Sequence, residues 1–199
     1  MQRHGLFNAE LYCNDWLFLA GPAVGAPMAV LCLEKLIALG ALRIVLYGWC
    51  GSLAQSLRVG DLFMPTDALS EEGTSAHYQP TPLPIDDTLH RDLLDRLISL
   101  GYAPNQGMIW TTDAVYRETR EKVASHGARG ILAVDMEYAA LRTVAAFRGV
   151  SLAALMLVSD ELTGAVWRSG YGQPVFRRQS RTLLVQLATL LSPSLNQLP

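Results

Sequence analysis

Acidic side chains follow apolar segments at two places where a carboxylate could do chemistry. Asp160 comes after the apolar run Ser151–Val158, and Asp135 and Glu137 lie at a predicted strand-to-helix junction. A carboxylic acid held partly out of water at a strand end can donate a proton, as a general acid must. The alternative is that these acids cap helices, because a helix N-terminus accommodates carboxylates. The pair Ser159-Asp160 fits an N-cap equally well.

The elements that would position these acids are predicted from the hydrophobic pattern. Strands are expected at Leu11–Ala20, Arg43–Tyr47, Gly107–Thr111 and Ser151–Val158. The segment Val59–Pro65 is expected to be a turn that enters a further strand. Helices are expected at Ala26–Leu39, Asp87–Leu100, Tyr116–Ser125, Glu137–Phe147 and Pro174–Leu191. Strands that alternate with helices, without a linker or repeat, predict a single α/β domain over residues 1–199 around a largely parallel sheet.

Ligands of such sheets collect beyond the carboxyl ends of the strands. The segments to examine are therefore those that follow each apolar run, namely Gly21–Gly25, Gly48–Gly51, Thr111–Asp113, Asp135–Glu137 and Ser159–Asp160. We expect the glycine-containing segments to be turns behind their strands.

Composition excludes several classes of protein. The chain has 199 residues, of which 50% are hydrophobic and 17% charged, so it is not disordered, collagen-like or a disulfide scaffold. A formal net charge of -2 argues against nucleic-acid binding and leaves a small molecule or another subunit as partner. The three cysteines have no metal-ligand or disulfide spacing, and no apolar stretch suits a signal peptide or membrane span. We expect a soluble cytoplasmic protein without a metal.

Several motifs follow one another along the chain: GPAVGAP, YGWCGSL, RVGDLFMPTDALSEEGTSAHY, TTDAVYRE, AVDMEYAAL and LMLVSDEL. With these motifs the chain resembles the nucleoside phosphorylase family, whose members act on purine or pyrimidine nucleosides. The resemblance implies a mixed, mostly parallel central β-sheet flanked by helices in three layers. It also implies self-association as a dimer or a trimer of dimers, with no cofactor other than inorganic phosphate as a co-substrate.

The resemblance further implies roles for the acidic residues. Glu137 would hold the ribose 2'- and 3'-hydroxyls, with Met136 packing on the sugar, because a carboxylate accepts two neighbouring hydroxyl hydrogens well. Asp160 would protonate or hydrogen-bond N7 of the base as the glycosidic bond breaks, so that the base does not leave as an anion. The pair Ser159-Asp160 favours purine over pyrimidine substrates.

The other substrate-binding residues that the resemblance implies come from the remaining motifs. Cys50 and Gly51 would line the base, Val115 and Tyr116 would cover it, and Val24 would lie under the ribose. Asp135 completes the implied set of substrate-binding residues.

The chain departs from the family pattern at the phosphate site. Family members carry a further N-terminal strand and a glycine-rich turn with a phosphate-binding arginine, or a water-activating glutamate in the nucleosidases, and we expect this segment to be missing here. The strand-end arginine falls at Leu46 and the neighbouring hydroxyl residue at Trp49. Neither side chain can neutralise a phosphate dianion. Hydrolysis is thus as plausible as phosphorolysis.

Three further residues are candidates for the site. Arg3 could be the family arginine contributed across a dimer interface, His77 could act on a nucleophile, and Arg168 could assist Asp160. The alternative for Arg3 is a solvated surface residue, and the alternative for His77 is an ordinary polar loop. The sequence therefore predicts cleavage of the N-glycosidic bond of a nucleoside, with a catalytically silent nucleoside-binding or scaffold protein as the alternative.

Overall fold

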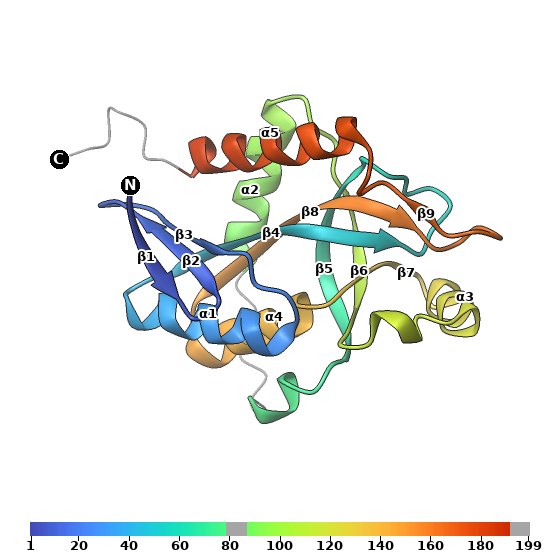
Figure 1. Cartoon of the computed structure of the whole chain (residues 1–199), viewed down its shortest axis with the longest axis horizontal. Helices are drawn as coiled ribbons and strands as arrows, with labels where there is room; N and C mark the ends of the chain where they lie inside the picture. The colour runs from blue at the N-terminus through green and yellow to red at the C-terminus, as the bar shows by residue number, and fades with distance from the viewer. Residues whose placement is uncertain (79–86, 192–199) are drawn as a thin grey trace.

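The structure is a computed structural model that describes residues 1–78 and 87–191 (Figure 1). Its strands are β1 (Gln2–Leu6), β2 (Ala9–Cys13), β3 (Phe18–Gly21), β4 (Arg43–Ser52), β5 (Leu62–Glu71), β6 (Asn105–Thr112), β7 (Ile131–Asp135), β8 (Ser151–Glu161) and β9 (Arg168–Ser169). Its helices are α1 (Ala26–Ala38), α2 (Thr88–Ser99), α3 (Arg120–Ala128), α4 (Tyr138–Arg148) and α5 (Pro174–Leu190), and Ser75–His77 (η1) and Val115–Arg117 (η2) are single 3₁₀ turns. This order of elements confirms the α/β prediction.

The main sheet is mixed and closes on itself. Its strand order is β4-β7-β6-β5-β8-β9, and β4 also pairs with β8, which completes a barrel-like ring. The pairings β4–β8, β5–β6 and β6–β7 are parallel, whereas β4–β7, β5–β8 and β8–β9 are antiparallel. The sequence indicated a mixed sheet between layers of helices but not this closure. The long β4–β8 pairing lies at the centre of the molecule in Figure 1.

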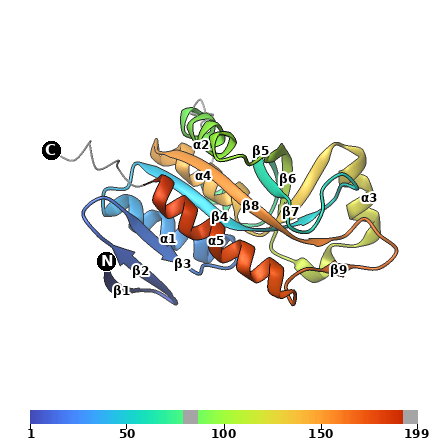
Figure 2. The same cartoon turned by 90° about the horizontal axis from the view of Figure 1, so that it is seen from above.

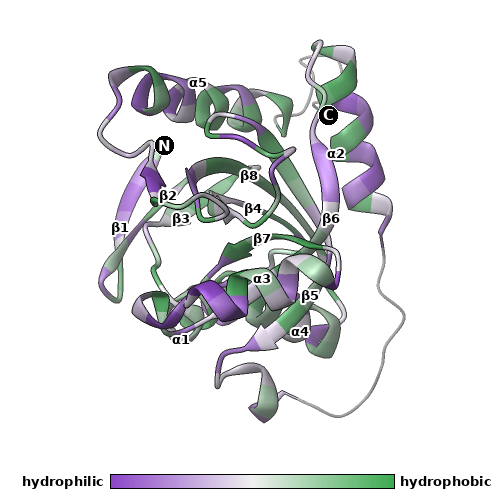
Figure 3. Ribbon diagram, turned by 90° about the vertical axis from the view of Figure 1, so that its right-hand side faces the viewer, coloured by the Kyte–Doolittle hydropathy of each residue, from purple (hydrophilic) through white to green (hydrophobic). Residues whose placement is uncertain are grey.

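Helices cover both sides of the β4–β8 pair. Leucines of α2 and α5 pack on one face of β8, and α1 packs with α4 on the other side. Figure 2 shows α5 running across β4 and β8. In Figure 3 β7 and β8 are coloured as hydrophobic, whereas α5 alternates between hydrophilic and hydrophobic residues, as expected for a helix with one buried face. Among the described residues, no helix is both long and apolar enough to cross a membrane.

The structure corrects the bounds of two predicted elements, the strand at Leu11–Ala20 and the helix at Tyr116–Ser125. The strand expected at Leu11–Ala20 is divided into β2 and β3, because the Asn14 side chain accepts hydrogen bonds from the backbone N–H groups of Trp16 and Leu17 and so forms a turn. The resulting hairpin joins β1 in a separate antiparallel sheet.

The helix expected at Tyr116–Ser125 begins only at Arg120. Thr119 has an extended backbone, and its hydroxyl accepts from the N–H of Lys122, so Thr119 is the N-cap of α3. The residues before it form η2 instead.

The segment Gly48–Gly51 is also corrected: it belongs to β4, which runs on to Ser52. Its glycines suggested a turn, yet the segment stays paired with β8. The register of that pairing shifts between Cys50, opposite Val158, and Gly51, opposite Asp160. Ser159 is therefore an extra residue in β8, and this β-bulge changes the face on which Asp160 lies.

Candidate functional site

Asp160 lies near the end of β8, in a group of hydrogen-bonding side chains that we call the Asp160 cluster: Ser159, Asp160, Trp167 and Tyr171. The Ser159 hydroxyl donates to Asp160 Oδ1 at 2.6 Å, and Trp167 Nε1 donates to Oδ2 at 2.7 Å. The Tyr171 hydroxyl lies 3.2 Å from Oδ1 and 3.1 Å from Ser159 Oγ. Both carboxylate oxygens of Asp160 thus accept hydrogen bonds, and the residue is only 7% exposed. The side chain is held in one orientation.

Gly51 provides the space that Asp160 occupies. A Cβ atom at Gly51 would lie 2.6 Å from Leu162 Cδ1, 3.1 Å from Val134 Cγ1 and 3.3 Å from Asp160 Oδ2. The absence of a side chain at Gly51 therefore lets the carboxylate approach the backbone of β4.

Glu137 belongs to a second group, the Glu137 cluster, consisting of Gly25, Asp135 and Glu137. Glu137 is the N-cap residue of α4, and its Oε1 accepts the backbone N–H of Gly25 at 2.5 Å. Gly25 has φ +84°, in the left-handed region, and precedes α1. This bond joins the loop before α1 to the β7–α4 junction.

Asp135 is the structural partner of this junction. Its carboxylate accepts from Thr111 Oγ1 at 2.6 Å and from the backbone N–H groups of Tyr138 and Glu137 at 2.7 and 3.1 Å. These bonds use the carboxylate to cap the first turn of α4 and to tie it to β6. The helix-capping alternative weighed above for the two acids describes Asp135 well, whereas the Glu137 side chain reaches across to another loop.

Burial changes the proton affinities of both acids. It raises the pKa of Glu137 to about 7, with a further contribution from the charges of Asp135 and Asp113. It also raises the pKa of Asp135 to about 6, against the opposing effect of the hydrogen bonds from Thr111, Tyr138 and Glu137. Perturbed carboxyl groups of this kind gather at functional sites.

Cys50 lies between the two clusters. Burial, and then the charges of Asp135 and Asp160, raise the pKa of its thiol well above the usual value. Its backbone carbonyl lies 3.1 Å from Ser159 Oγ, as an alternative acceptor to Asp160 Oδ1 for the single hydrogen of that hydroxyl. The thiol is therefore neutral. The Asp160 cluster and the Glu137 cluster face a shared region at the ends of β4, β7 and β8.

Leu46 and Trp49 have apolar surroundings. Leu46 packs against the buried cores on the inner side of β4. Trp49 points toward α5: its Nε1 donates to Ser180 Oγ at 2.9 Å, and its ring lies 5.5 Å from Tyr171 and 5.3 Å from Phe176. Neither offers a charged group to an anion.

The remaining predicted residues are more exposed. Val24, Val115 and Tyr116 are 72%, 47% and 98% exposed, Met136 is half-buried, and His77 is exposed in η1. Arg3 lies in β1 and is paired with Glu10. Arg168 stands opposite Glu161 in the β8–β9 pairing, with 3.9 Å between the charged groups, and so does not reach Asp160.

Sequence reasoning assigned no role to four residues that the structure brings near the two acids: Gly25, Glu118, Trp167 and Tyr171. Burial, followed by the charge of Asp160, raises the pKa of Glu118 to about 7. The motifs GPAVGAP and TTDAVYRE contain Gly25 and Glu118, so a signal for both was present. Trp167 and Tyr171 lie beyond the quoted motifs, on the far side of a chain reversal.

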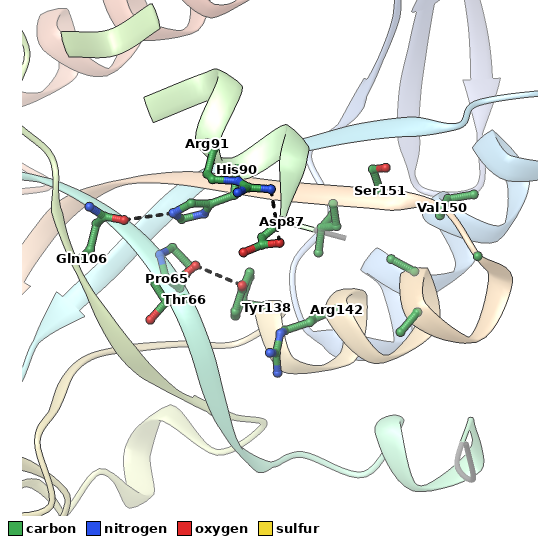
Figure 4. Close-up of a pocket in the computed structure, with 14 residues that line it drawn as sticks. Pro65, Thr66, Asp87, His90, Arg91, Gln106, Tyr138, Arg142, Val150 and Ser151 are labelled. Carbon is green, nitrogen blue, oxygen red and sulfur yellow. Dashed lines mark hydrogen bonds and ion pairs between the residues drawn. The ribbon is translucent and has the colours of Figure 1, made fainter. Parts of the chain in front are cut away.

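A pocket of about 480 Å³ lies elsewhere, between α2, α4 and the amino ends of β6 and β8 (Figure 4). His90, Gln106, Tyr138 and Arg142 are among its lining residues, and none of the predicted site residues lines it. His90 Nε2 is 3.0 Å from Gln106 Oε1, and Tyr138 donates to the carbonyl of Pro65. The pocket thus lies at the amino end of β8, whereas Asp160 lies near the carboxyl end of that strand.

Comparison with known proteins shows the family to which the chain belongs and several relatives that it resembles. A sequence profile described as "Phosphorylase superfamily" matches residues 9–185. Guanosine phosphorylase of Halorubrum lacusprofundi is 29% identical over 165 residues, which cover 81% of this chain and 67% of that protein. Purine nucleoside phosphorylase DeoD-type of Caldanaerobacter subterraneus subsp. tengcongensis is 30% identical over 158 residues, covering 76% and 67%. The protein of the same name from Clostridium beijerinckii is 28% identical over 187 residues, covering 90% and 78%.

Proposed function

Since the chain belongs to the phosphorylase superfamily, we propose that it cleaves the N-glycosidic bond of a purine nucleoside, with phosphate as the attacking group. In this reaction a phosphate oxygen bonds to C1' of the ribose while the bond from C1' to the base breaks. The bonding electrons leave with the base, and a proton at N7 neutralises it. Relatives named guanosine phosphorylase and purine nucleoside phosphorylase support this reaction class.

The observation that carries the proposal is the way Asp160 is held. Its two oxygens are fixed by Ser159, Tyr171 and Trp167 in a nearly water-free position. A fixed carboxyl group beside the base can deliver a proton to N7 or hold one there without first reorganising. Asp160 is accordingly the proposed catalytic acid, and Cys50 and Gly51 are proposed to line the base.

Glu137 is the proposed ribose ligand. The N–H of Gly25 occupies one lone pair of Oε1, and the backbone of Met136 also hydrogen-bonds to the carboxylate, so the remaining lone pairs are proposed to accept the 2'- and 3'-hydroxyls. Met136 is proposed to pack on the sugar, and Val24, Val115 and Tyr116 to close over the nucleoside. Asp135 acts in this proposal by placing Glu137, through its bond to the Glu137 N–H.

Hydrolysis is a second candidate, and the surroundings of Leu46 and Trp49 favour it. Both occupy positions at which the resemblance would place phosphate ligands. Leu46, however, packs against the apolar core, and the Trp49 indole is hydrogen-bonded to Ser180. The described acids of both clusters would also repel an anion. Phosphorolysis in this chain therefore requires cations from outside these clusters. We propose that they come from a second copy of the chain in a homo-oligomer, with Arg3 as the candidate side chain.

The experiment is base release from a panel of purine and pyrimidine nucleosides, measured with phosphate varied from zero to saturating. Phosphorolysis predicts ribose 1-phosphate and a rate that depends on phosphate. Free ribose at a phosphate-independent rate identifies hydrolysis. Asp160→Asn is expected to abolish turnover, whereas Glu137→Gln mainly raises KM. Nucleoside binding without product under any condition would identify a catalytically silent binding protein, and full activity in Asp160→Asn would refute the assigned mechanism.

A further inference from the structure

We propose that Trp167 is a positioning residue for Asp160, a role that its indole N–H performs in place of a cation. This inference rests on the proposed function of Asp160, but the contact itself can be tested without any assay of turnover. Trp167 lies in the turn between β8 and β9, and no motif of the sequence pointed to it.

The direction of the contact is unambiguous. Indole Nε1–H is a donor only, so the 2.7 Å contact to Asp160 Oδ2 is a hydrogen bond from the ring to the carboxylate. Oδ1 is already held by Ser159 and Tyr171. Without Trp167, the carboxylate would keep its donors on one oxygen only and could rotate about its Cβ–Cγ bond. Trp167 therefore supplies the restraint that the other two residues do not.

The backbone around Trp167 fixes the position of the indole. β9 pairs with β8 so that Ser169 stands opposite Asp160. Immediately after it, the N–H of Gly170 donates to the Ser159 carbonyl at 2.7 Å. A Cβ atom at Gly170 would lie 2.5 Å from Val59 Cγ1 and 2.7 Å from that carbonyl, so the chain can pass this closely only as glycine. Figure 1 shows β9 folded back along the end of β8.

The nearby cations are directed to a different acid. Arg58 Nη1 lies 2.9 Å from Glu161 Oε2, and Arg168 Nη1 lies 3.9 Å from the same oxygen. Because side chains alternate along β8, Glu161 and Asp160 lie on opposite faces. A neutral donor thus holds Asp160. Such a donor adds no positive charge next to the N7 position, where a cation would oppose protonation of the base.

The indole ring contributes little to the core, which makes the contact testable. Trp167 is 59% exposed, so Trp167→Phe removes the N–H and keeps an aromatic ring in the turn. Trp16→Phe is the matched control, because Trp16 is also an exposed indole (42%) and lies in the turn between β2 and β3. Equal unfolding midpoints of the two variants would show that fold stability is not the cause of any difference.

The first readout is how the substitution divides between kcat and KM. Loss of one hydrogen bond to a charged group lowers kcat about tenfold or more with little change in KM. Trp16→Phe should keep the wild-type kcat, so the comparison separates this effect from the general effect of losing an exposed indole.

The second readout does not depend on activity. In protein labelled with ¹⁵N at the indoles, the Trp167 Nε1–H signal, identified by its loss in Trp167→Phe, should move in Asp160→Asn while the Trp16 signal stays in place. An unmoved Trp167 signal, or a Trp167→Phe variant with the wild-type kcat, would overturn the proposal. A moved signal in a protein that releases no base would uphold the contact and reject the proposed function instead.

Discussion

The backbone N–H of Gly25 donates to the side chain of Glu137 at 2.5 Å, although the two residues are 112 positions apart in the chain. The bond connects the loop before α1 with the first residue of the α4 turn, and thus two elements that are otherwise joined through apolar packing. It fixes the one carboxylate proposed to hold the ribose.

Gly25→Ala is expected to weaken substrate binding through this bond. Gly25 has φ +84°, whereas the nearest atom to an added Cβ is Pro27 Cδ at 4.0 Å, so the cost is backbone strain rather than a clash. Strain of this kind is about 1–2 kcal/mol in the free energy of unfolding. We expect KM to rise several-fold with little effect on kcat. Gly5→Ala is the control, because Gly5 has no atom within 4 Å of its Cβ position. Equal KM values for the two variants would contradict the assignment.

Glu137→Gln is expected to change how stability depends on pH. The pKa of Glu137 is about 7 in the folded protein and about 4.3 in the unfolded chain, so the folded state binds the proton more tightly. Its contribution to stability is therefore complete below about pH 4 and is lost as pH rises through 7. Glutamine, which does not titrate, avoids this loss.

The free energy of unfolding of Glu137→Gln, relative to wild type, should thus increase by about 1–2 kcal/mol between pH 4.5 and pH 8, a value reduced for partial exposure. Denaturant unfolding at several pH values measures this difference. Glu121→Gln is the control, because the pKa of Glu121 is lowered and it should show no such increase. A difference that is flat with pH would show that Glu137 is not protonated near neutrality.

Gly51→Ala is expected to damage catalysis more than stability. The added methyl group would approach Leu162 Cδ1 to 2.6 Å and Asp160 Oδ2 to 3.3 Å, so the leucine side chain or the carboxylate must move. We expect kcat to fall at least tenfold, since displacement of a catalytic group by a fraction of an ångström is costly. Gly48→Ala, in the same strand with open space at its Cβ position, should retain wild-type kcat. Steady-state kinetics of the two variants measure this difference in kcat, and equal kcat values would contradict the prediction.

The cysteines should react with a thiol reagent in a fixed order. Cys13 is half-buried, whereas Cys32 and Cys50 are buried and burial raises the pKa of both thiols. Because the thiolate is the reactive form, Cys13 should label first and Cys50 only on unfolding. Cys13→Ser should remove the fast phase, as mass spectrometry of the labelled peptides can establish. Rapid labelling of Cys50 in the native protein would show that the region between the acids is open.

Helices α1 and α5 could be predicted from the sequence because their signals are local. Pro27 and an apolar run define α1, predicted as Ala26–Leu39 and observed as Ala26–Ala38. In α5 the predicted and observed ends differ by one residue, at Leu191 and Leu190. Closure of the sheet could not be predicted, because it depends on β4 continuing through Gly48–Gly51, and glycines in sequence indicate turns.

The acids of the candidate site were visible in the sequence, but the groups that hold them were not. Asp160 and Glu137 stand out as charged residues after apolar runs. The donors that hold them, Trp167 and Gly25, come from other segments. Their contacts exist only through a chain reversal at β9 and a left-handed residue before α1, and neither feature has a periodic signature. The assignment of the site residues to catalysis stays a prediction.

The pairing of β4 with β8 makes the Asp160 cluster depend on contacts between distant parts of the chain. The carbonyl of Cys50 and the hydroxyl oxygen of Ser159 lie 3.1 Å apart at the bulge, although the two residues are 109 positions apart in the chain. Such a contact must offset the entropy of closing a long loop before it contributes any stability. A chain still being synthesised therefore has no positioned Asp160 until β8 has emerged and inserted beside β4. Recovery of turnover during refolding would consequently report the moment at which the ring of strands becomes complete.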